Sequence, residues 1–354
     1  MKFNDLDCFL LQAQKEDIEL MELLILEKKS LLQTTQFCIL PYVNATIEKP
    51  KKSYFLVNSS QLIHKKLLSI NESQGLKLKS KSTKEDYIRK VIKLKEHIQL
   101  GNIYEINFCI EFYAKDVLID PVSVFIKLQQ LTKAPYCKLV KLNDDFIISA
   151  SPELFLKKQN STLFSKPIKG TIKRGSSGEE DERLKLKLGN SIKERTENVM
   201  AVDVARNDLS IIAQKGTVKV NKLYNIESFE TVHQMVSTVS CELNENANFE
   251  AIINATFPMA SMTGAPKVSA MKLISEFEDF ERNYYSGAMG LIEANGDFEL
   301  SVIIRSIFYN QETKRLSIAV GSAITHLCDP EKEYEECLLK ANALLKALNA
   351  EIEN

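Results

Sequence analysis

Phe257-Pro-Met-Ala-Ser-Met-Thr-Gly-Ala-Pro-Lys267 is the stretch of this chain that says most about its fold. It sets glycine and two prolines beside hydroxyl side chains and closes on a lysine. Such residues form tight turns and let the backbone approach a neighbour or a ligand closely. The stretch therefore predicts a backbone pocket rather than a packed core. Tyr285-Ser-Gly-Ala-Met-Gly290 and Ile303-Ile-Arg305 follow it, and Pro167-Ile-Lys-Gly-Thr171 precedes it.

Bulk composition excludes several classes of protein. The 354 residues are 44% hydrophobic and 26% charged, as in an ordinary soluble globular protein. The 46 basic and 47 acidic residues nearly cancel, so neither nucleic acid nor an anionic membrane is an expected partner. No run approaches the ~18 apolar residues of a membrane span, and no signal peptide is evident. Seven scattered cysteines without a CxxC pair indicate reduced thiols, hence a cytoplasmic location.

The order of expected elements predicts an α+β protein. Ser82-Thr-Lys-Glu85 is a capping box that opens a helix, and Asp329-Pro330 opens another. Residues 185–209 also have a helical pattern, and the Ser/Lys-rich residues 76–84 are the best candidate linker. Short strands are expected at residues 104–112, 137–142, 146–149, 153–156, 301–309 and 315–320. These helices and strands interleave without strict βαβ order, which favours the α+β class.

Two pairs of glutamates predict a metal site. Glu194 and Glu197 are three residues apart on one expected helix, and Glu333 and Glu336 on another. A spacing of three places both carboxylates of a pair on one helix face. Two such faces in contact would offer the oxygen ligands that Mg²⁺ prefers. For each pair alone, a solvated helix face is the alternative.

Three single residues have a functional and a structural interpretation. Arg305 is expected to share an apolar strand face with Ile303 and Ile307, so it needs an anionic partner, either a structural carboxylate or a ligand. Glu153 in Ser151-Pro-Glu-Leu-Phe155 would have a raised pKa if buried, but Ser-Pro-Glu is also a common turn. Lys169 before a glycine would, alone, be a surface loop residue.

Together these motifs resemble the chorismate-utilising enzymes, namely anthranilate, aminodeoxychorismate, isochorismate and salicylate synthases. The resemblance covers roughly residues 82–348. It implies two large antiparallel β-sheets packed as a sandwich, with outer helices and the site between them. Residues 81–354 would form the chorismate-binding catalytic region, and residues 1–80 a reduced N-terminal part of the same fold.

The resemblance also implies roles for particular residues. Glu197 and Glu336 would bind Mg²⁺, supported by Glu194 and Glu333, and the metal would hold the ring carboxylate of chorismate. Glu153 would act as a general acid that protonates the departing 4-hydroxyl. Thr263 completes the catalytic set. The implied substrate-binding residues are Tyr285, Arg305, Gly321, Ser322, Lys340, Glu105 and Gln234.

Lys169 narrows the choice within the family, because the aminodeoxychorismate synthases resemble this chain in placing a lysine there. The implied role is attack on C2 of chorismate with loss of the 4-hydroxyl, after which ammonia attacks C4 and displaces the lysine. A nucleophilic lysine must be neutral, so desolvation or nearby cations should lower its pKa. The prediction is an aminodeoxychorismate synthase component I that serves p-aminobenzoate and folate synthesis.

Other assignments remain open. Anthranilate synthase component I is the nearest alternative, and isochorismate synthase is another, although the water-activating lysine of that enzyme is replaced here by Glu105. The amine-transferring enzymes usually have glutamine at that position. The chain shows no cysteine elbow with histidine and glutamate partners, so ammonia is expected from solution or from a glutamine amidotransferase subunit. A non-catalytic subunit that binds the glutaminase ranks lowest.

Some positions depart from the family pattern. Met259-Ala260 replaces two glycines, and Gly321-Ser-Ala-Ile324 replaces a glycine-rich backbone cradle. The family histidine falls at Gln234, and His233 lies one residue away, where a structural role is favoured.

Overall fold

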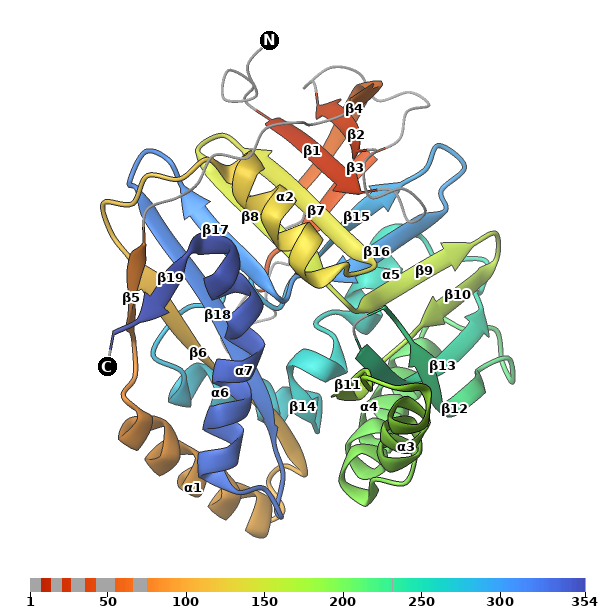
Figure 1. Ribbon diagram of the computed structural model, residues 1–354. Coiled ribbons are helices and arrows are strands. Elements are labelled where there is room, and N and C mark those ends of the chain that lie inside the picture. The colour runs from red at the N-terminus through yellow and green to blue at the C-terminus, as the bar shows by residue number, and fades with distance from the viewer. Residues whose placement is uncertain are drawn as a thin grey trace.

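Two large β-sheets and seven α-helices make up the part of the chain that the computed structural model describes (Figure 1). The described residues are 8–13, 21–26, 36–42, 55–65, 75–230 and 232–353. The sheets are almost entirely antiparallel, and both contain β4 (Phe55–Lys65), which pairs with a strand of each. The predicted α+β class and two-sheet architecture are confirmed.

The first sheet combines strands from both ends of the chain. From β4 its neighbours are β2 (Met21–Leu26), β1 (Cys8–Ala13), β7 (Tyr136–Leu142), β8 (Asp145–Ser151), β17 (Ser306–Asn310), β18 (Arg315–Ile324) and β6 (Glu105–Ala114). Beside β6 lie β5 (Leu76–Ser80) and β14 (Gly264–Ala265), and β5 also pairs in parallel with β19 (Ala350–Ile352).

The second sheet is built in the same way. From β4 it continues through β3 (Gln36–Leu40), β15 (Ala288–Ile292), β16 (Phe298–Val302), β9 (Leu154–Gln159), β10 (Thr162–Ser165) and β13 (Val232–Glu242). Both β11 (Ile168–Lys173) and β12 (Lys219–Ser228) pair with β13. The strands before residue 66 therefore extend both sheets, because β1 pairs with β7 and β3 with β15.

Apolar side chains hold the two sheets together. One buried cluster joins β3 and β15 to β7 and β8 through Ile39, Met289, Val140 and Ile147. Helices α1 (Lys84–Gln99), α2 (Pro121–Thr132), α6 (Lys267–Phe277) and α7 (Pro330–Leu348) pack on the first sheet. Helices α3 (Gly178–Gly189), α4 (Ile192–Ser210) and α5 (Phe249–Thr256) lie beside the second.

Local sequence signals place two of these helices. Thr83, rather than Ser82, caps α1 by accepting a hydrogen bond from the Asp86 amide at 3.1 Å, and the predicted face with Tyr87 is buried. Asp329 caps α7 through the Glu331 amide at 3.0 Å. Both predicted helix starts are confirmed to within a residue or two.

The predicted linker was wrong, whereas the predicted helical pattern over residues 185–209 is confirmed except for one interruption. Residues 76–84 are not a linker, since β5 pairs with β6. The helix expected over 185–209 is two helices, which end and begin around Asn190 and the cap Ser191.

The predicted strand over residues 301–309 was also wrong. It is broken between β16 and β17, and Arg305 at the break has a left-handed φ of 52°. Arg305 therefore does not share a strand face with Ile303 and Ile307.

Residues 257–267 form a backbone pocket against β6. Ala260–Met262 is a 3-10 turn, and Gly264 in β14 pairs with Ile106 of β6. The φ of Gly264 is +147°, and a Cβ placed there would lie 2.2 Å from the Glu105 carbonyl oxygen. Only glycine fits this close approach.

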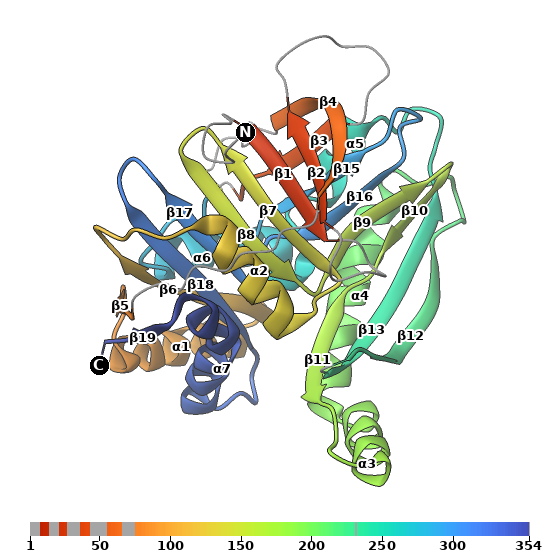
Figure 2. The same ribbon diagram turned by 45° about the horizontal axis from the view of Figure 1, so that its top comes forward.

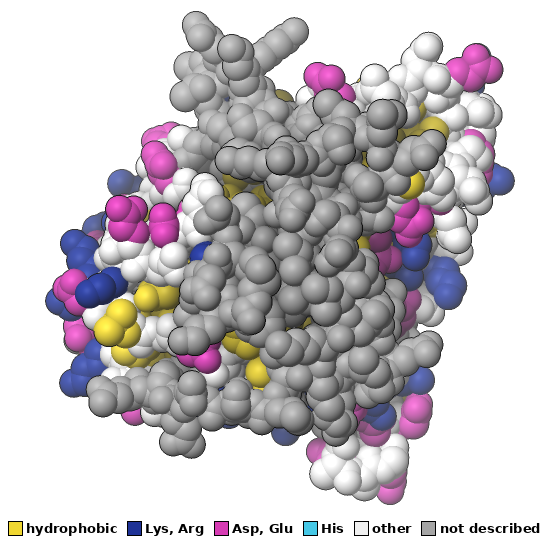
Figure 3. All heavy atoms as spheres, turned by 90° about the horizontal axis from the view of Figure 1, so that it is seen from above, with side chains coloured by type: hydrophobic (Ala, Val, Ile, Leu, Met, Phe, Trp, Pro, Cys, Tyr) yellow, Lys and Arg dark blue, Asp and Glu magenta, His cyan; other side chains and the backbone are white. Residues whose placement is uncertain are grey.

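Surface and thiol properties agree with the composition. No helix in the described ranges is long and apolar enough to span a membrane. The six cysteines whose side chains are described are free and buried. In the view from above, acidic and basic side chains are interspersed around the described part of the face (Figure 3).

Candidate active site

A cavity of about 490 Å³ lies between α4 and β11 on one side and α7 and β18 on the other. Figure 2 shows β11 and α7 on either side of this region, with α3 projecting beyond β11. The volume is in the range of small-molecule sites. Ten predicted site residues line the cavity, namely Glu153, Lys169, Glu194, Glu197, Gln234, Tyr285, Arg305, Gly321, Glu336 and Lys340.

Lys169 reaches the cavity from β11 and forms an ion pair with Glu105 of β6. Both side chains are buried, at 8% and 4% exposure. Burial lowers the pKa of Lys169. The charges of Glu105, Glu197 and Glu153 and the hydrogen bond to Glu105 raise this pKa by a larger amount, so the net pKa lies above the ordinary lysine value. The expectation of a lowered pKa was wrong for this structure, because the neighbours of Lys169 are carboxylates rather than cations.

Gly170 allows this arrangement. Its φ is +86°, and a Cβ there would lie 2.8 Å from Oε2 of Glu194. Glycine therefore lets the first turns of α4 lie directly against the residue that follows Lys169, which brings the glutamates of α4 to the cavity.

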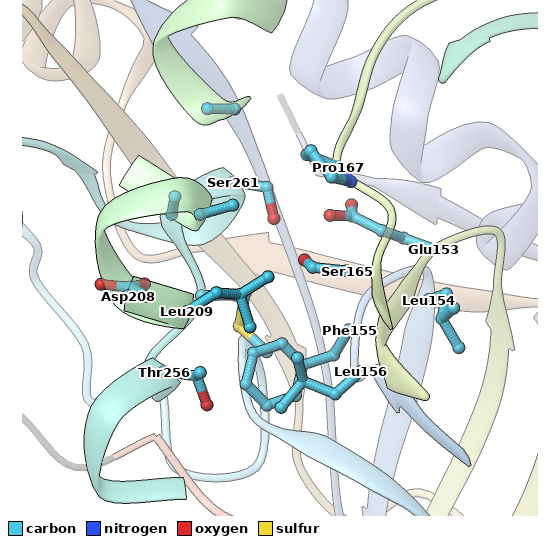
Figure 4. A pocket seen from close by; sticks show the side chains of 14 residues that line it. Glu153, Leu154, Phe155, Leu156, Ser165, Pro167, Asp208, Leu209, Thr256 and Ser261 are labelled. Atoms are coloured by element: carbon cyan, nitrogen blue, oxygen red, sulfur yellow. The ribbon is translucent and has the colours of Figure 1, made fainter. Parts of the chain in front are cut away.

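Glu153 precedes β9 and is buried beside the same cavity. Burial raises its pKa to about 7, although the Ser261 hydroxyl and the charges of Lys169 and Lys340 act in the opposite direction. Figure 4 shows the Ser261 hydroxyl beside the Glu153 carboxyl group. A carboxyl group with a pKa near 7 can donate a proton at neutral pH.

Lys193 connects the two glutamate-bearing helices. Its ammonium lies 3.0 Å from Oε1 of Glu333 on α7 and 3.8 Å from Oε1 of Glu197 on α4. The two predicted helix faces therefore meet across the mouth of the cavity. Glu194, Glu197 and Glu336 line it, whereas Glu333 lies outside it, in contact with Lys193.

Some carboxylates of this region have the free oxygens that a divalent cation needs, but they do not form a complete set of ligands among the described residues. Two buried oxygens, Oε1 of Glu197 and Oε2 of Glu333, have no hydrogen-bond partner among the described residues. Burial raises the pKa of Glu197 to about 7, so its carboxylate would gain from a cation. Within the described ranges, however, no three His, Cys, Asp or Glu side chains form a ready metal cluster. Magnesium suits such a site, since it needs only one or two protein carboxylates besides water and a substrate anion.

Two cations lie on the α7 side of the cavity. Lys340 donates to the Gly321 carbonyl oxygen at 2.7 Å and lies 2.7 Å from Oε1 of Glu336. The Arg305 guanidinium donates to the Lys340 carbonyl oxygen at 3.4 Å, and no carboxylate of the described residues is within ion-pair distance of it. Burial lowers the pKa of Arg305, yet an arginine remains charged, so it retains capacity for an anion.

Several predicted residues do not present side chains to the cavity. The Thr263 hydroxyl donates to the Met259 carbonyl oxygen at 3.0 Å, and the Ser322 hydroxyl lies 2.9 Å from the Tyr87 hydroxyl. These placements give no support to side-chain roles for Thr263 and Ser322. His233 is buried between Asp181 and Ser228, a structural position, as the sequence favoured.

Five polar residues of the cavity wall were not predicted from the sequence. They are Asn107, Thr171, Lys173, Lys193 and Ser261. Lys193 had a recognisable signal, because it lies four residues before Glu197 on one helix face. The other four depend on contacts between distant segments.

The geometry defines what this cavity can bind. Lys169, Lys193, Arg305 and Lys340 supply positive charge at different points of the wall, and Glu153 supplies a proton. A small molecule with two carboxylates and a leaving hydroxyl would be complementary to such a wall.

The chain resembles proteins that act on such a molecule. Residues 10–346 match the family model described as chorismate binding enzyme. Aminodeoxychorismate synthase component 1 of Escherichia coli is 36% identical over 269 residues, which are 76% of this chain and 59% of that protein. Anthranilate synthase component 1 of Saccharolobus solfataricus is 37% identical over 75% of this chain and 62% of its own length. The chain thus spans about three fifths of the length of these curated relatives.

Solved structures share the fold at lower identity. Anthranilate synthase component I of Streptococcus pneumoniae superposes with a TM-score of 0.74 at 22% identity, over 95% of this chain and 89% of that chain. MenF, the menaquinone-specific isochorismate synthase of Escherichia coli, gives a TM-score of 0.78 at 16% identity, over 97% and 89%.

Proposed function

This chain belongs to the chorismate-binding enzyme family, and we propose that within it the protein acts as aminodeoxychorismate synthase component I. The reaction would convert chorismate and ammonia to 4-amino-4-deoxychorismate, a precursor of p-aminobenzoate and folate. The proposal depends above all on Lys169, a buried amine in the cavity wall that also contains Glu153. The buried and unbridged thiols fit a cytoplasmic enzyme.

The first half of the reaction needs a neutral lysine and a protonated acid. Lys169 transfers its proton to Glu105, its ion-pair partner, and the free amine attacks C2 of chorismate. The ring double bonds shift, the bond from C4 to oxygen breaks, and Glu153 gives its proton to the departing hydroxyl, which leaves as water. The product of this half is a covalent adduct on Lys169.

The second half restores the enzyme. Ammonia attacks C4, the double bonds shift back, and the bond between C2 and the lysine nitrogen breaks. The lysine leaves as a neutral amine and regains the proton that Glu105 held. Because the lysine occupies C2 during the adduct, the amine is directed to C4. The enolpyruvyl group remains on the ring, which distinguishes the product from anthranilate.

Substrate binding uses the remaining charges of the cavity. Glu197 and Glu336 would hold Mg²⁺, with Glu194 and Glu333 in support, and the ion when bound neutralises a substrate carboxylate. Arg305, close to Tyr285 in the wall, would bind the other carboxylate with Lys340. Gln234 and the backbone at Gly321 complete the contact surface.

Anthranilate synthase is the second candidate, favoured by the relative from Saccharolobus solfataricus at 37% identity. That reaction places the amine at C2 and eliminates pyruvate. The position of Lys169 in the wall argues against it, since a lysine bonded to C2 would block the amine there.

The product formed from chorismate, Mg²⁺ and ammonium tests the proposal. We expect 4-amino-4-deoxychorismate, with little anthranilate or isochorismate. Without ammonium, mass spectrometry should detect an adduct on the peptide that contains Lys169, and Lys169→Ala should lose it. Anthranilate as the main product would overturn the assignment, as would unchanged output from Lys169→Ala.

A glutamine amidotransferase subunit is the proposed source of ammonia in the cell. The isolated chain should use ammonium salts but not glutamine, and addition of a glutaminase subunit should enable glutamine use. Release of glutamate from glutamine by the chain alone would contradict this part of the proposal.

A further inference from the structure

A second, much smaller cavity adjoins the active site behind Glu153. Its volume is about 30 Å³, and it shares Glu153 and Ser261 with the large cavity (Figure 4). A space of this size accommodates one molecule as small as water or ammonia. This cavity is therefore too small to hold the ring of a substrate, and its occupant has to be a smaller molecule.

The polar wall of this small cavity consists of oxygen-bearing side chains. They are Glu153, Ser165, Asp208, Thr256 and Ser261. None of the described side chains that line it carries a nitrogen donor. Carboxylate and hydroxyl oxygens accept hydrogen bonds, and an ammonium ion has four N–H groups to donate.

The Ser261 hydroxyl is available for a ligand. Ser261 is 7% exposed, and its oxygen has no partner at full hydrogen-bond geometry among the described residues, although it lies near enough to the Glu153 carboxyl group to lower the pKa of that group. A buried hydroxyl without a partner costs free energy unless a small molecule satisfies it. The Thr256 hydroxyl, by contrast, already donates to the Ile252 carbonyl oxygen at 2.7 Å. Asp208 is likewise committed, since it lies 2.5 Å from the ammonium of Lys267.

We infer that this small cavity is the subsite for ammonium, where Ser261 and Glu153 hold the nitrogen that attacks C4. The inference rests on the proposed function, because it assigns the place of the second substrate in that reaction. Apolar side chains, among them Phe155, Leu209 and Met259, form the rest of the wall.

The proton balance of the reaction agrees with an ammonium subsite beside Glu153. After Glu153 has given its proton to the departing hydroxyl, it is a carboxylate. It then takes a proton from ammonium, which yields neutral ammonia beside C4 and restores the protonated acid. Ammonia forms the bond to C4 and the lysine leaves as a neutral amine, so the net reaction is chorismate plus ammonium to the protonated amine product plus water. No further reactant is needed.

Two substitutions test the subsite by different means. Ser261→Ala removes the hydroxyl, and we expect the KM for ammonium to rise about tenfold, the effect of a lost hydrogen bond to a charged group. Ala205→Val fills the cavity from α4 without removing a polar atom and should raise the same KM at least as much. In Ala205→Val, whose position lies outside the lining of the large cavity, the KM for chorismate should stay within about twofold of wild type.

The adduct on Lys169 separates this inference from the proposed function. It forms without ammonia, so Ala205→Val, which leaves the lining of the large cavity intact, should accumulate it as the wild type does. Ser240→Ala is the matched control, because Ser240 is a serine of similar burial at 6% exposure whose hydroxyl donates to Asn221 far along β13. This control should leave both KM values unchanged.

Three outcomes overturn the inference. Normal adduct formation with an unchanged ammonium KM in both variants would mean that the cavity holds water only, and the proposed function would survive. An equal rise of both KM values would make Ser261 part of the chorismate site alone. No aminodeoxychorismate from the wild type would overturn the proposed function and the subsite together.

Discussion

The ammonium of Lys169 and the carboxylate of Glu105 form a buried ion pair, although 64 residues separate them in the sequence. The pair joins β11 of the second sheet to β6 of the first, so it bridges the two sheets at the active site. It stabilises the charged form of a lysine whose proposed chemistry needs the neutral form. Glu105 therefore opposes formation of the nucleophilic neutral amine, and it is also the ion-pair partner that can accept the proton of Lys169.

Replacement of Glu105 by glutamine should lower the pKa of Lys169. The variant removes the main cause that raises this pKa and leaves the burial that lowers it. The rate at which an amine-reactive reagent modifies Lys169, followed by peptide mass spectrometry across pH 6–11, should shift to lower pH in Glu105→Gln. The exposed Lys272 is the internal control, and an identical profile for Lys169 in both proteins would refute the coupling.

Activity should decline on the alkaline side of neutrality because Glu153 loses its proton. Burial raises the pKa of this carboxyl group to about 7, so above that pH the acid is progressively ionised. We expect kcat/KM for chorismate to fall toward tenfold per pH unit in the alkaline limb. Glu153→Gln should reduce kcat by about 10²–10⁴-fold and abolish that limb. An alkaline limb that persists in the residual activity of Glu153→Gln would assign it to another group.

Segments with strong local signals could be predicted from the sequence. Asp329-Pro330 fixes the start of α7 because the cap bonds are made within one turn. The turn-rich stretch ending at Lys267 likewise predicts its own backbone pocket, since glycine is needed wherever two backbones approach. The resemblance to a known family supplied the two-sheet fold, which local patterns alone did not.

Features set by distant contacts could not be predicted. Residues 301–309 have the apolar pattern of one strand, but the Ser286 amide donates to the Ile303 carbonyl oxygen at 2.9 Å and the Ile303 amide to that of Gly287 at 2.8 Å. The Arg305 carbonyl oxygen instead accepts from the Ala150 amide of β8 at 3.1 Å. The chain therefore passes from the second sheet to the first at this point, and Arg305 lies in the cavity wall. The raised pKa of Lys169 was missed for the same reason, because its partner lies in another sheet.

A single methyl group at Gly264 should destabilise the protein strongly. A Cβ there would lie 2.2 Å from the Glu105 carbonyl oxygen, and φ is +147°, so Gly264→Ala combines a steric clash with backbone strain. We expect a loss of about 3 kcal/mol or more in the free energy of unfolding, measured by urea denaturation. Gly178→Ala is the control, since no atom of the described residues lies within 4 Å of a Cβ at that first residue of α3. Equal stability of the two variants would contradict the close approach of β14 to β6.

The proposed metal site makes a prediction about stability that does not require turnover. Burial raises the pKa of Glu197 from 4.5 to about 7 in the folded state, so its contribution to stability is full below pH 4.5 and is lost as the pH rises through 7. Without metal, Glu197→Gln should therefore raise the Tm at pH 8 and have little effect at pH 4.5. Mg²⁺ should raise the Tm of the wild type at pH 8, because it binds the folded state.

Removal of a ligand carboxylate should abolish the increase in Tm that Mg²⁺ produces. Glu197→Gln and Glu336→Gln keep the side-chain size but remove a carboxylate each, so we expect neither variant to gain Tm on addition of Mg²⁺, and both to lose aminodeoxychorismate formation. Glu194→Gln should be milder, at about 10–100-fold in metal affinity, as for a residue that supports the ligands. Exposed Glu312 supplies the control, since Glu312→Gln removes the same charge outside the cavity and should leave the Mg²⁺ response intact. A full Tm increase with Mg²⁺ in both Glu197→Gln and Glu336→Gln would refute the metal assignment, whatever their activity.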